Sequence, residues 1–435
     1  MQRVLTFEQS PALSVPLRFL LTAPLFAVLA ALVLLWFGPA AMASRWSPVT
    51  LAVTHLLTLG FLAMCMIGSL LQILPVVAGI DIPRIRLVGG VTHALLVAGT
   101  LTLVSAFLLS APVLFKIAIP VLLLAFAWLF LAGLRTIWTG TEKSAMLTAI
   151  RLALASLVVT LLLGATAASG FAWPISLPLM QLTDLHAAWG LLGWVGLLVV
   201  GIAYQVVPMF QVTPIYPVPV TQWLSRIAFG LLLLWSATLA LGPELPWHGM
   251  LFTTIAGAYI VFSLTTLYLL SQRKRPKPDA TTMFWRTALA SLLGCATLWC
   301  AGRVYPQADA MPAYPLVIGI LFIVGFGYSV INGMLYKIVP FLVWYHLQNQ
   351  LAGGCAKAPN VKQILPDMAA ERQFRAHLLA LLLLLAGAIA PEWLSHAGAA
   401  AFAVSSGWLW LNLLKAAGIY RSKLAANPVT TQRPS

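Results

Sequence analysis

Twelve apolar runs divide the sequence, and all of them except the eleventh, which is short, are long enough to cross a lipid bilayer. A helix rises 1.5 Å per residue, so about 20 apolar residues span the hydrocarbon core. Hydrophobic residues make up 61% of the chain and charged residues 8%, whereas a soluble domain carries roughly 25% charged residues. The sequence therefore predicts an all-α polytopic membrane protein whose main partner is the lipid bilayer. The predicted spans cover residues 18–37, 49–73, 88–110, 112–134, 150–169, 186–208, 223–241, 249–271, 284–303, 315–341, 376–391 and 397–416.

One motif occurs three times, in the second, sixth and tenth predicted spans. In every copy two glycines lie eight residues apart, a polar residue follows four positions later, and a proline follows seven positions after the second glycine. The copies are separated by 133 and then 132 residues. A fixed pattern at nearly equal intervals indicates an internal repeat. The copies are Gly60, Gly68, Gln72 and Pro75; Gly193, Gly201, Gln205 and Pro208; and Gly325, Gly333, Lys337 and Pro340.

Twelve spans divide into three repeats of four, with the motif on the second span of each repeat. We therefore predict one membrane domain, residues 1–435, containing quasi-symmetric repeats at approximately 18–134, 150–271 and 284–416. The second glycine, the polar residue and the proline lie within about 40° of one stripe of a helix. Since glycine permits close approach of membrane helices, we interpret the motif as a packing surface for one neighbouring helix.

The net charge of +15 predicts the orientation of the chain and requires no nucleic-acid partner. Lys and Arg residues in short loops remain on the cytoplasmic side of a membrane. With a cytoplasmic N-terminus, 22 of the 25 Lys and Arg residues lie on that side, and only Arg45, Lys116 and Arg303 lie outside. Both termini are then cytoplasmic. The basic runs also suit contact with anionic lipid headgroups.

His55 and His186 are the candidate ligands of a metal centre. His55 lies about one turn into the second predicted span and His186 begins the sixth, both at the outer side. Imidazole binds haem iron, copper and zinc, and a polar group inside a membrane is costly enough to be a functional candidate. A histidine bonded to a backbone carbonyl or a neighbouring helix is the structural alternative. His55 precedes Gly60 by five residues and His186 precedes Gly193 by seven, so the two would be different ligands of an asymmetric site.

The other titratable residues contribute less to the predicted site. Asp184 is expected to cap the helix that contains His186. Carboxylates are almost absent from the predicted spans, so no proton relay built from them is expected. The other outer histidines are His248 and His396, and the inner ones, which cannot reach the outer group, are His93, His346 and His377.

Three sulfur-containing residues adjoin the first copy of the motif. Met64, Cys65 and Met66 carry the soft ligands that copper(I) prefers. Successive side chains on a helix point about 100° apart, so the three cannot converge on one ion. We interpret the triplet as packing.

Together these features resemble the haem-copper oxidase superfamily, in particular subunit I of cytochrome oxidases and the related nitric oxide reductases. The likeness consists of twelve spans as three quasi-symmetric arcs of four, cytoplasmic termini, and histidines on spans two and six. The resemblance implies that His55 is an axial ligand of a low-spin haem and that His186 is a copper ligand. As architecture it covers nearly the whole chain.

The sequence departs from that family where the catalysis of the family resides. Span seven lacks the adjacent histidine pair, since residues 222–241 contain no histidine, and span ten lacks the His-x-His, since residues 314–332 contain none. A binuclear oxygen-reducing centre cannot be assembled in the usual way, so we expect neither a terminal oxidase nor a proton pump. The spacing of His55, Gly60, Gly68 and Pro75 is also loosely similar to a motif of the NnrS family, haem- and copper-containing membrane proteins linked to the nitric oxide response.

The leading hypothesis is a protein of the bacterial inner membrane that binds haem, with copper as a further candidate, near the outer face through His55 and His186. Its expected role is in respiratory or nitric oxide-related metabolism, with other respiratory membrane proteins as candidate partners. Enzymatic activity and oligomeric state stay open. One alternative is a transporter or permease without a cofactor, although transporters commonly consist of two six-span halves. The other is an assembly factor for a respiratory complex.

Overall fold

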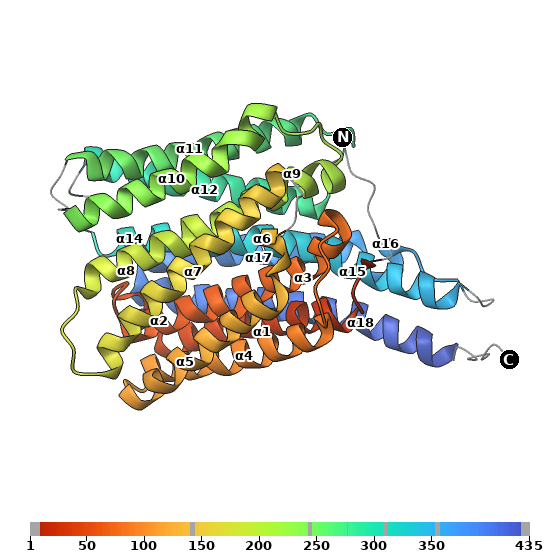
Figure 1. Ribbon diagram of the computed structural model, residues 1–435, viewed down its shortest axis with the longest axis horizontal. Helices are drawn as coiled ribbons and strands as arrows, with labels where there is room; N and C mark the ends of the chain where they lie inside the picture. The colour runs from red at the N-terminus through yellow and green to blue at the C-terminus, as the bar shows by residue number, and fades with distance from the viewer. Residues whose placement is uncertain are drawn as a thin grey trace.

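The computed structural model describes residues 9–139, 144–241, 246–275, 277–305, 307, 311–352 and 357–427. These residues form helices and no strands, and twelve candidate spans confirm the predicted number. The helices run side by side, with α4 and α5 at one edge of the bundle and α10 and α11 at the opposite edge (Figure 1). Their bounds are α1 Ser14–Phe37, η2 Gly38–Met42, α2 Pro48–His55, η3 Leu56–Ala63, α3 Met64–Ala78, α4 Ile85–Leu108, α5 Pro112–Trp128, η4 Leu129–Gly133, α6 Thr136–Thr139, α7 Ala145–Ala172, α8 Leu179–Ala188, η5 Trp189–Gly196, α9 Leu197–Gln211, α10 Val218–Leu241, α11 Pro246–Ser271, α12 Ala280–Val304, α14 Ala313–Ile320, η6 Leu321–Tyr328, α15 Ser329–Leu351, α16 Val361–Ile364, α17 Asp367–Ile389 and α18 Pro391–Ala426.

Nine of the spans form a closed ring. Each packs against the next one in the order α1, α4, α5, α7, α10, α11, α12, α17 and α18, and α18 packs back against α1. The remaining three, Pro48–Ala78, Leu179–Gln211 and Ala313–Leu351, are the spans that carry the repeated motif, and we call them the central spans. Their most apolar windows are 78%, 67% and 56% buried, whereas no other span exceeds 50%. The motif therefore lies on the core of the bundle.

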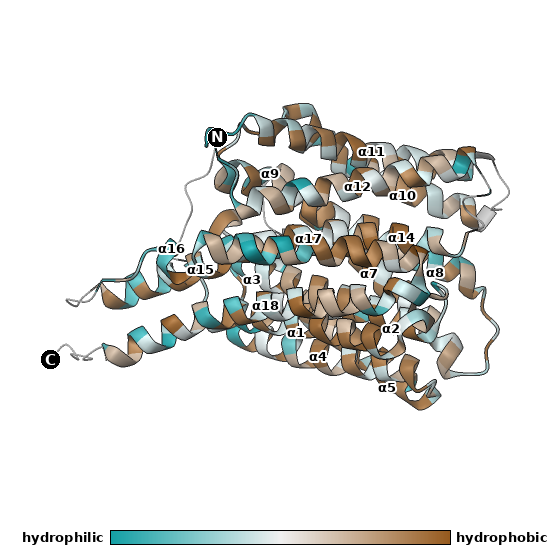
Figure 2. Cartoon of the chain, turned by 180° about the vertical axis from the view of Figure 1, so that it is seen from behind, coloured by the Kyte–Doolittle hydropathy of each residue, from teal (hydrophilic) through white to brown (hydrophobic). Residues whose placement is uncertain are grey.

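The outer surface of the ring is apolar at membrane depth. Leu131, Leu162, Leu264 and Val404 each expose more than half of their side chains. Hydrophobic residues also cover the outward faces of the helices (Figure 2). Exposed apolar area on this scale requires a non-aqueous surrounding, so the ring contacts the lipid bilayer.

Each central span contains a π-helical segment, in which the backbone bonds skip one residue more than in an α-helix. The segments η3, η5 and η6 each contain eight residues. They begin at Leu56, Trp189 and Leu321, which are 133 and 132 residues apart. In each segment the first glycine of the motif is the fifth residue. The sequence periodicity is thus matched by a recurring irregularity of the backbone.

The motif glycines lie against the ring helix that precedes each central span. A Cβ added at any of the six would lie only 2.6 or 2.7 Å from the Cβ of the facing residue. Such a distance excludes any larger side chain without movement of a helix, which confirms the predicted packing role. On each ring helix the two facing residues are seven positions apart: Phe19 and Phe26 on α1, Ala149 and Ser156 on α7, and Phe284 and Ser291 on α12.

The polar residue of the motif has a partner near the same ring helix in two copies. The side-chain nitrogen of Gln72 donates to Ser10 Oγ at 2.9 Å, shortly before α1 begins. Lys337 Nζ lies 2.8 Å from Asp279 Oδ2, and Asp279 caps α12 by accepting from the backbone N–H of Thr282. These bonds anchor one end of the central spans to the ring.

Several predicted span boundaries differ from the structure. The tenth span was expected to end at 341 and the eleventh to begin at 376, but α15 continues to Leu351 and α17 begins at Asp367. The polar segment 344–350 extends the helix of the tenth span beyond the apolar run, and α15 and α18 project past the rest of the bundle (Figure 1). Gly353, Gly354 and Cys355 lie outside the described residues.

Candidate metal centre

The rings of His55 and His186 lie next to each other. His55 is the last residue of α2 and directly precedes η3, and His186 lies three residues before η5. Their ring centroids are 6.1 Å apart and their planes differ by 21°. The two residues named as candidate ligands from the sequence therefore meet at one place, where two central spans begin their π-helical segments.

Backbone carbonyls determine the tautomer of both rings. His55 Nδ1 lies 2.8 Å from the carbonyl oxygen of Leu51, and His186 Nδ1 lies 2.9 Å from that of Thr160. A carbonyl oxygen can only accept, so each Nδ1 carries the proton and donates. In a neutral imidazole Nε2 then carries the free lone pair. The backbone hydrogen bonds of both rings are made through Nδ1.

Aromatic and small residues surround this pair. Phe107 stacks on His55 with ring centroids 5.4 Å apart. The His55 imidazole therefore has two ring neighbours, Phe107 and His186. Gly164 of α7 gives His186 its space, since a Cβ there would be 2.7 Å from His186 Cε1. The rings are thus held by a backbone bond and by close packing.

The donor set fits a metal ion. Histidine ligands usually donate the non-coordinating N–H to a backbone carbonyl or a carboxylate, which fixes the ring and leaves the other nitrogen for the metal. Metal–imidazole bonds are about 2.0–2.1 Å long, so two imidazoles on opposite sides of one ion have ring centres about 6 Å apart. The observed 6.1 Å is in that range. Among the described residues, no group of three or more His, Cys, Asp and Glu side chains gathers as a metal site.

The position of Asp184 differs from the expectation. It was expected to cap the helix that contains His186, but α8 begins at Leu179 and Asp184 lies inside it. Its carboxylate instead pairs with Arg45 Nη2 at 2.7 Å, and both side chains are about two-fifths exposed. This ion pair connects the segment that precedes α2 to α8. His55 lies on α2, and His186 lies on α8.

The other outer histidines and His93 contact other residues. His248 Nδ1 is 3.1 Å from Thr238 Oγ1, and His396 lies against Gly38. His93 Nε2 contacts Thr22 Oγ1 at 2.9 Å, on the side of α1 near its start. None of these contacts involves His55 or His186.

His377 was predicted at the inner edge of the eleventh span, and this depth is wrong. Because α17 begins at Asp367, His377 is ten residues inside the helix and fully buried. Its Nε2 is 2.7 Å from Ser329 Oγ, and the ring of Tyr328 stacks on it. The Tyr328 hydroxyl in turn bonds Ser406 at 3.0 Å. A correct start for the helix, marked by Pro366 and Asp367, would have revealed this buried polar cluster.

The oxidase resemblance assigns His55 to a haem and His186 to a separate copper ion, whereas the structure brings the two rings side by side, with centroids 6.1 Å apart. The amino-acid sequence matches no protein-family model and no curated protein sequence. Sequence and structure together establish an all-helical membrane protein with twelve candidate spans.

Proposed function

We propose that this protein is a redox-active membrane protein in which His55 Nε2 and His186 Nε2 bind one metal centre, a haem iron. The observation that supports the proposal is the pair of imidazoles 6.1 Å apart, each with its Nδ1 proton donated to a backbone carbonyl. Copper is the second candidate, because two imidazole nitrogens suit it equally.

The residues of this chain would orient the ligands and exclude water. Leu51 and Thr160 hold the rings through their carbonyl oxygens, while Phe107 and Gly164 define the space around them. A haem iron with two imidazole ligands supplies one-electron transfer when it is bound. Such a centre would serve respiratory or nitric oxide-related metabolism, not oxygen reduction coupled to proton pumping.

We also propose an architecture like that of oxidase subunit I, with three quasi-symmetric repeats of four spans. Three recurring features support it: the sequence motif, the π-helical segments at intervals of 133 and 132 residues, and the seven-residue spacing of the residues that face the glycines. The distribution of Lys and Arg supports a bacterial inner membrane location with both termini in the cytoplasm. In that orientation the imidazole pair lies near the outer face.

The visible spectrum of detergent-purified protein tests the function. Cells should be supplied with haem and copper, and iron and copper should be measured per chain. We expect a Soret band that disappears in both His55→Ala and His186→Ala. His93→Ala is the matched control, because His93 contacts Thr22 instead, and it should keep the band.

The other outcomes separate the alternatives. The protein could instead contain one copper ion per chain and show no Soret band. If both variants lose that copper, the proposed metal centre stands, with copper in place of iron. A colourless preparation without either metal would overturn the proposal and favour a transporter or an assembly factor. A Soret band that survives both substitutions would place the haem elsewhere.

A further inference from the structure

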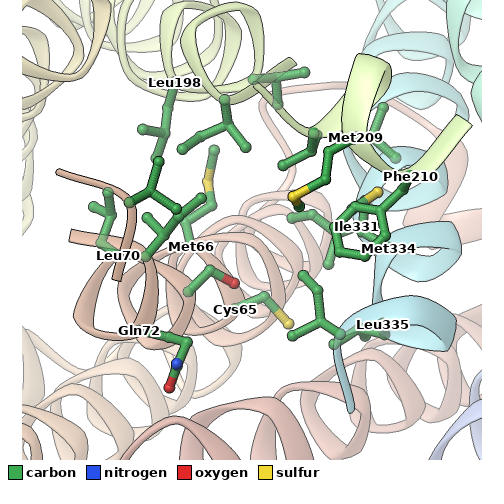
Figure 3. A pocket seen from close by; sticks show the side chains of 18 of the residues that line it. Cys65, Met66, Leu70, Gln72, Leu198, Met209, Phe210, Ile331, Met334 and Leu335 are labelled. Carbon is green, nitrogen blue, oxygen red and sulfur yellow. The ribbon is translucent and has the colours of Figure 1, made fainter. Parts of the chain in front are cut away.

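A second candidate site lies between the three central spans, and it contains no histidine. Its volume is about 360 Å³, within the range of small-molecule sites. Side chains from α3, α9 and α15 line it from three sides (Figure 3). We call it the axial chamber.

The lining of the axial chamber follows the internal repeat. Of its 22 lining residues, 18 fall into six sets of three that are separated by the same 133 and 132 residues as the motif. Ser69, Ile202 and Met334 form one set. Equivalent positions of the three repeats therefore form most of the chamber wall. The lining set nearest the middle of the spans is Cys65, Leu198 and Val330, and the set nearest their ends is Val77, Phe210 and Leu342.

The dimensions of the chamber suit one hydrocarbon chain. From Cys65 to Val77 the helix advances about 18 Å at 1.5 Å per residue. One leaflet of a bilayer core is about 15 Å deep, which is the depth that an acyl chain occupies. The lining is almost entirely aliphatic, aromatic or sulfur-containing, and a cavity of this kind excludes water and takes apolar ligands.

The sulfur atoms of Met66 and Met209 in the lining cannot belong to one metal site. Met209 is equivalent to Val76 in the repeat, ten positions beyond Met66, so the two lie about 15 Å apart along the axis. Metal–sulfur bonds are about 2.3 Å long, so these atoms cannot share an ion. Methionine is flexible and adapts to apolar ligands of varied shape, which suits a hydrocarbon chain.

One end of the chamber is basic. Val77 and Phe210 are the next-to-last residues of α3 and α9. The backbone N–H of Lys274 donates to the carbonyl of Val212 at 3.0 Å, which fixes a basic segment beside the end of α9. Arg273 bonds Thr282, and Thr282 bonds Gln211, which follows Phe210. Lys337 adds a third cation there, and Asp279 is the carboxylate paired with it.

We propose that the axial chamber binds a single acyl chain of an anionic amphiphile, a fatty acid or an anionic phospholipid. The chain lies between the central spans, and the anionic head lies at the end marked by Arg273 and Lys274. Trp285 lines the chamber five residues from the start of α12 and has a buried Nε1–H without an acceptor among the described residues, so it can donate to a head oxygen.

Binding of a conjugated polyene fatty acid, whose fluorescence increases in apolar surroundings, tests the proposal. Full-length protein should be delipidated in detergent and titrated. We expect saturable binding at about one ligand per chain, weakened at least about tenfold by Ile202→Phe, which fills the chamber. Val206→Phe is the second filling variant. Leu264→Phe, on the lipid-facing side of α11, is the control and should bind normally.

Competition distinguishes the two sources of the acyl chain. A free fatty acid and an anionic phospholipid are each used to displace the fluorescent fatty acid, and the better competitor is the natural class. Lys274→Gln should weaken binding of the fatty acid and leave that of the matching fatty alcohol unchanged. The absence of saturable binding would overturn the proposal, as would unchanged binding in both filling variants at normal melting temperature. A quinone or a metal ion retained by the native protein and lost in Ile202→Phe would also overturn it. Binding should persist in His55→Ala, so the result is independent of the metal centre.

Discussion

Gly164 is the residue that controls the position of the His186 ring. A Cβ at this position would lie 2.7 Å from His186 Cε1 and 3.0 Å from His186 Nδ1, the atom that bonds the Thr160 carbonyl. The hydrogen bond from His186 Nδ1 to the Thr160 carbonyl therefore depends on the absence of a side chain at Gly164. This link can be tested whether or not a metal is bound.

Gly164→Ala should destabilise the protein by about 1–3 kcal/mol, because the added methyl group displaces the imidazole from its hydrogen bond. The apparent melting temperature in detergent measures the loss. In a His186→Ala background the same substitution should cost little, since the ring is gone. Gly257→Ala, where no atom lies within 4 Å of the added Cβ, should be neutral or slightly stabilising. Equal losses in both backgrounds would contradict the contact.

The identities of the two candidate ligands could be inferred from sequence, but their proximity could not. His55 and His186 were selected because an imidazole in an apolar span is costly. Their proximity depends on which faces of α2 and α8 meet, and no local pattern encodes that. Asp184 was misplaced because α8 begins seven residues before the apolar run that was used to locate the span.

At the scale of the helix, the second motif glycine sets how closely each central span approaches the ring. A Cβ at Gly68, Gly201 or Gly333 would lie 2.6 Å from the Cβ of the facing residue in all three copies. A Cβ cannot rotate away, so relief requires movement of the helix itself.

Substituting alanine at Gly68, Gly201 and Gly333 should therefore lower stability by similar amounts, about 1–3 kcal/mol each. Thermal unfolding in detergent measures the three losses side by side. Gly230→Ala, in open surroundings on α10, is the matched control. A neutral result at two of the three positions would show that these interfaces adapt freely.

The Asp279–Lys337 pair should make stability depend on pH. Burial alone would raise the pKa of Asp279, but Lys337 and the hydrogen bonds of Thr282 lower it, and the net pKa lies below the ordinary 3.8. A depressed pKa in the folded state stabilises the protein above the unfolded value, and this contribution disappears as pH falls through the folded value. Asp279→Asn should thus cost about 1–3 kcal/mol at neutral pH. The difference in melting temperature from the unsubstituted protein should shrink below pH ~4; a difference that does not change with pH would exclude this origin.

The helices differ in how far their details could be predicted. The glycines and prolines marked the central spans correctly, because small residues at fixed spacing report close packing. The π-helical segments η3, η5 and η6 share a glycine at their fifth position and an aromatic residue at their sixth, but neither residue type by itself predicts a π-helix. The end of α15 was missed because Tyr345, Gln348 and Asn349 continue the helix without apolar character.

At the scale of the molecule, we predict that both chain ends lie on one face of the membrane, because the candidate spans number twelve. We expect a reporter fused after Ala426 to have the same location as one inserted near residue 275, between α11 and α12. A reporter near residue 175, between α7 and α8, should have the opposite location. Paired reporters active on either side of the membrane measure this. Opposite locations for the first two would require an odd number of crossings between them.

The number of spans could be predicted because hydrocarbon thickness fixes the length of an apolar run. The closed ring of nine spans could not, since neighbour relations such as α18 against α1 join opposite ends of the chain. The axial chamber was likewise out of reach. Cys65 and Met66 were assigned to packing, and both are indeed buried, yet they also face the chamber.

The outward direction of the glycine contacts has a mechanical consequence. Gly68 faces α1, whereas Ile73, which lines the chamber, points about 140° away from it on the same helix. The tightest contacts of the central spans are therefore peripheral, and the middle of the bundle is its most compressible part. Hydrostatic pressure acts against internal voids, so a rise in pressure should draw the central spans together around the chamber before it displaces the helices of the ring.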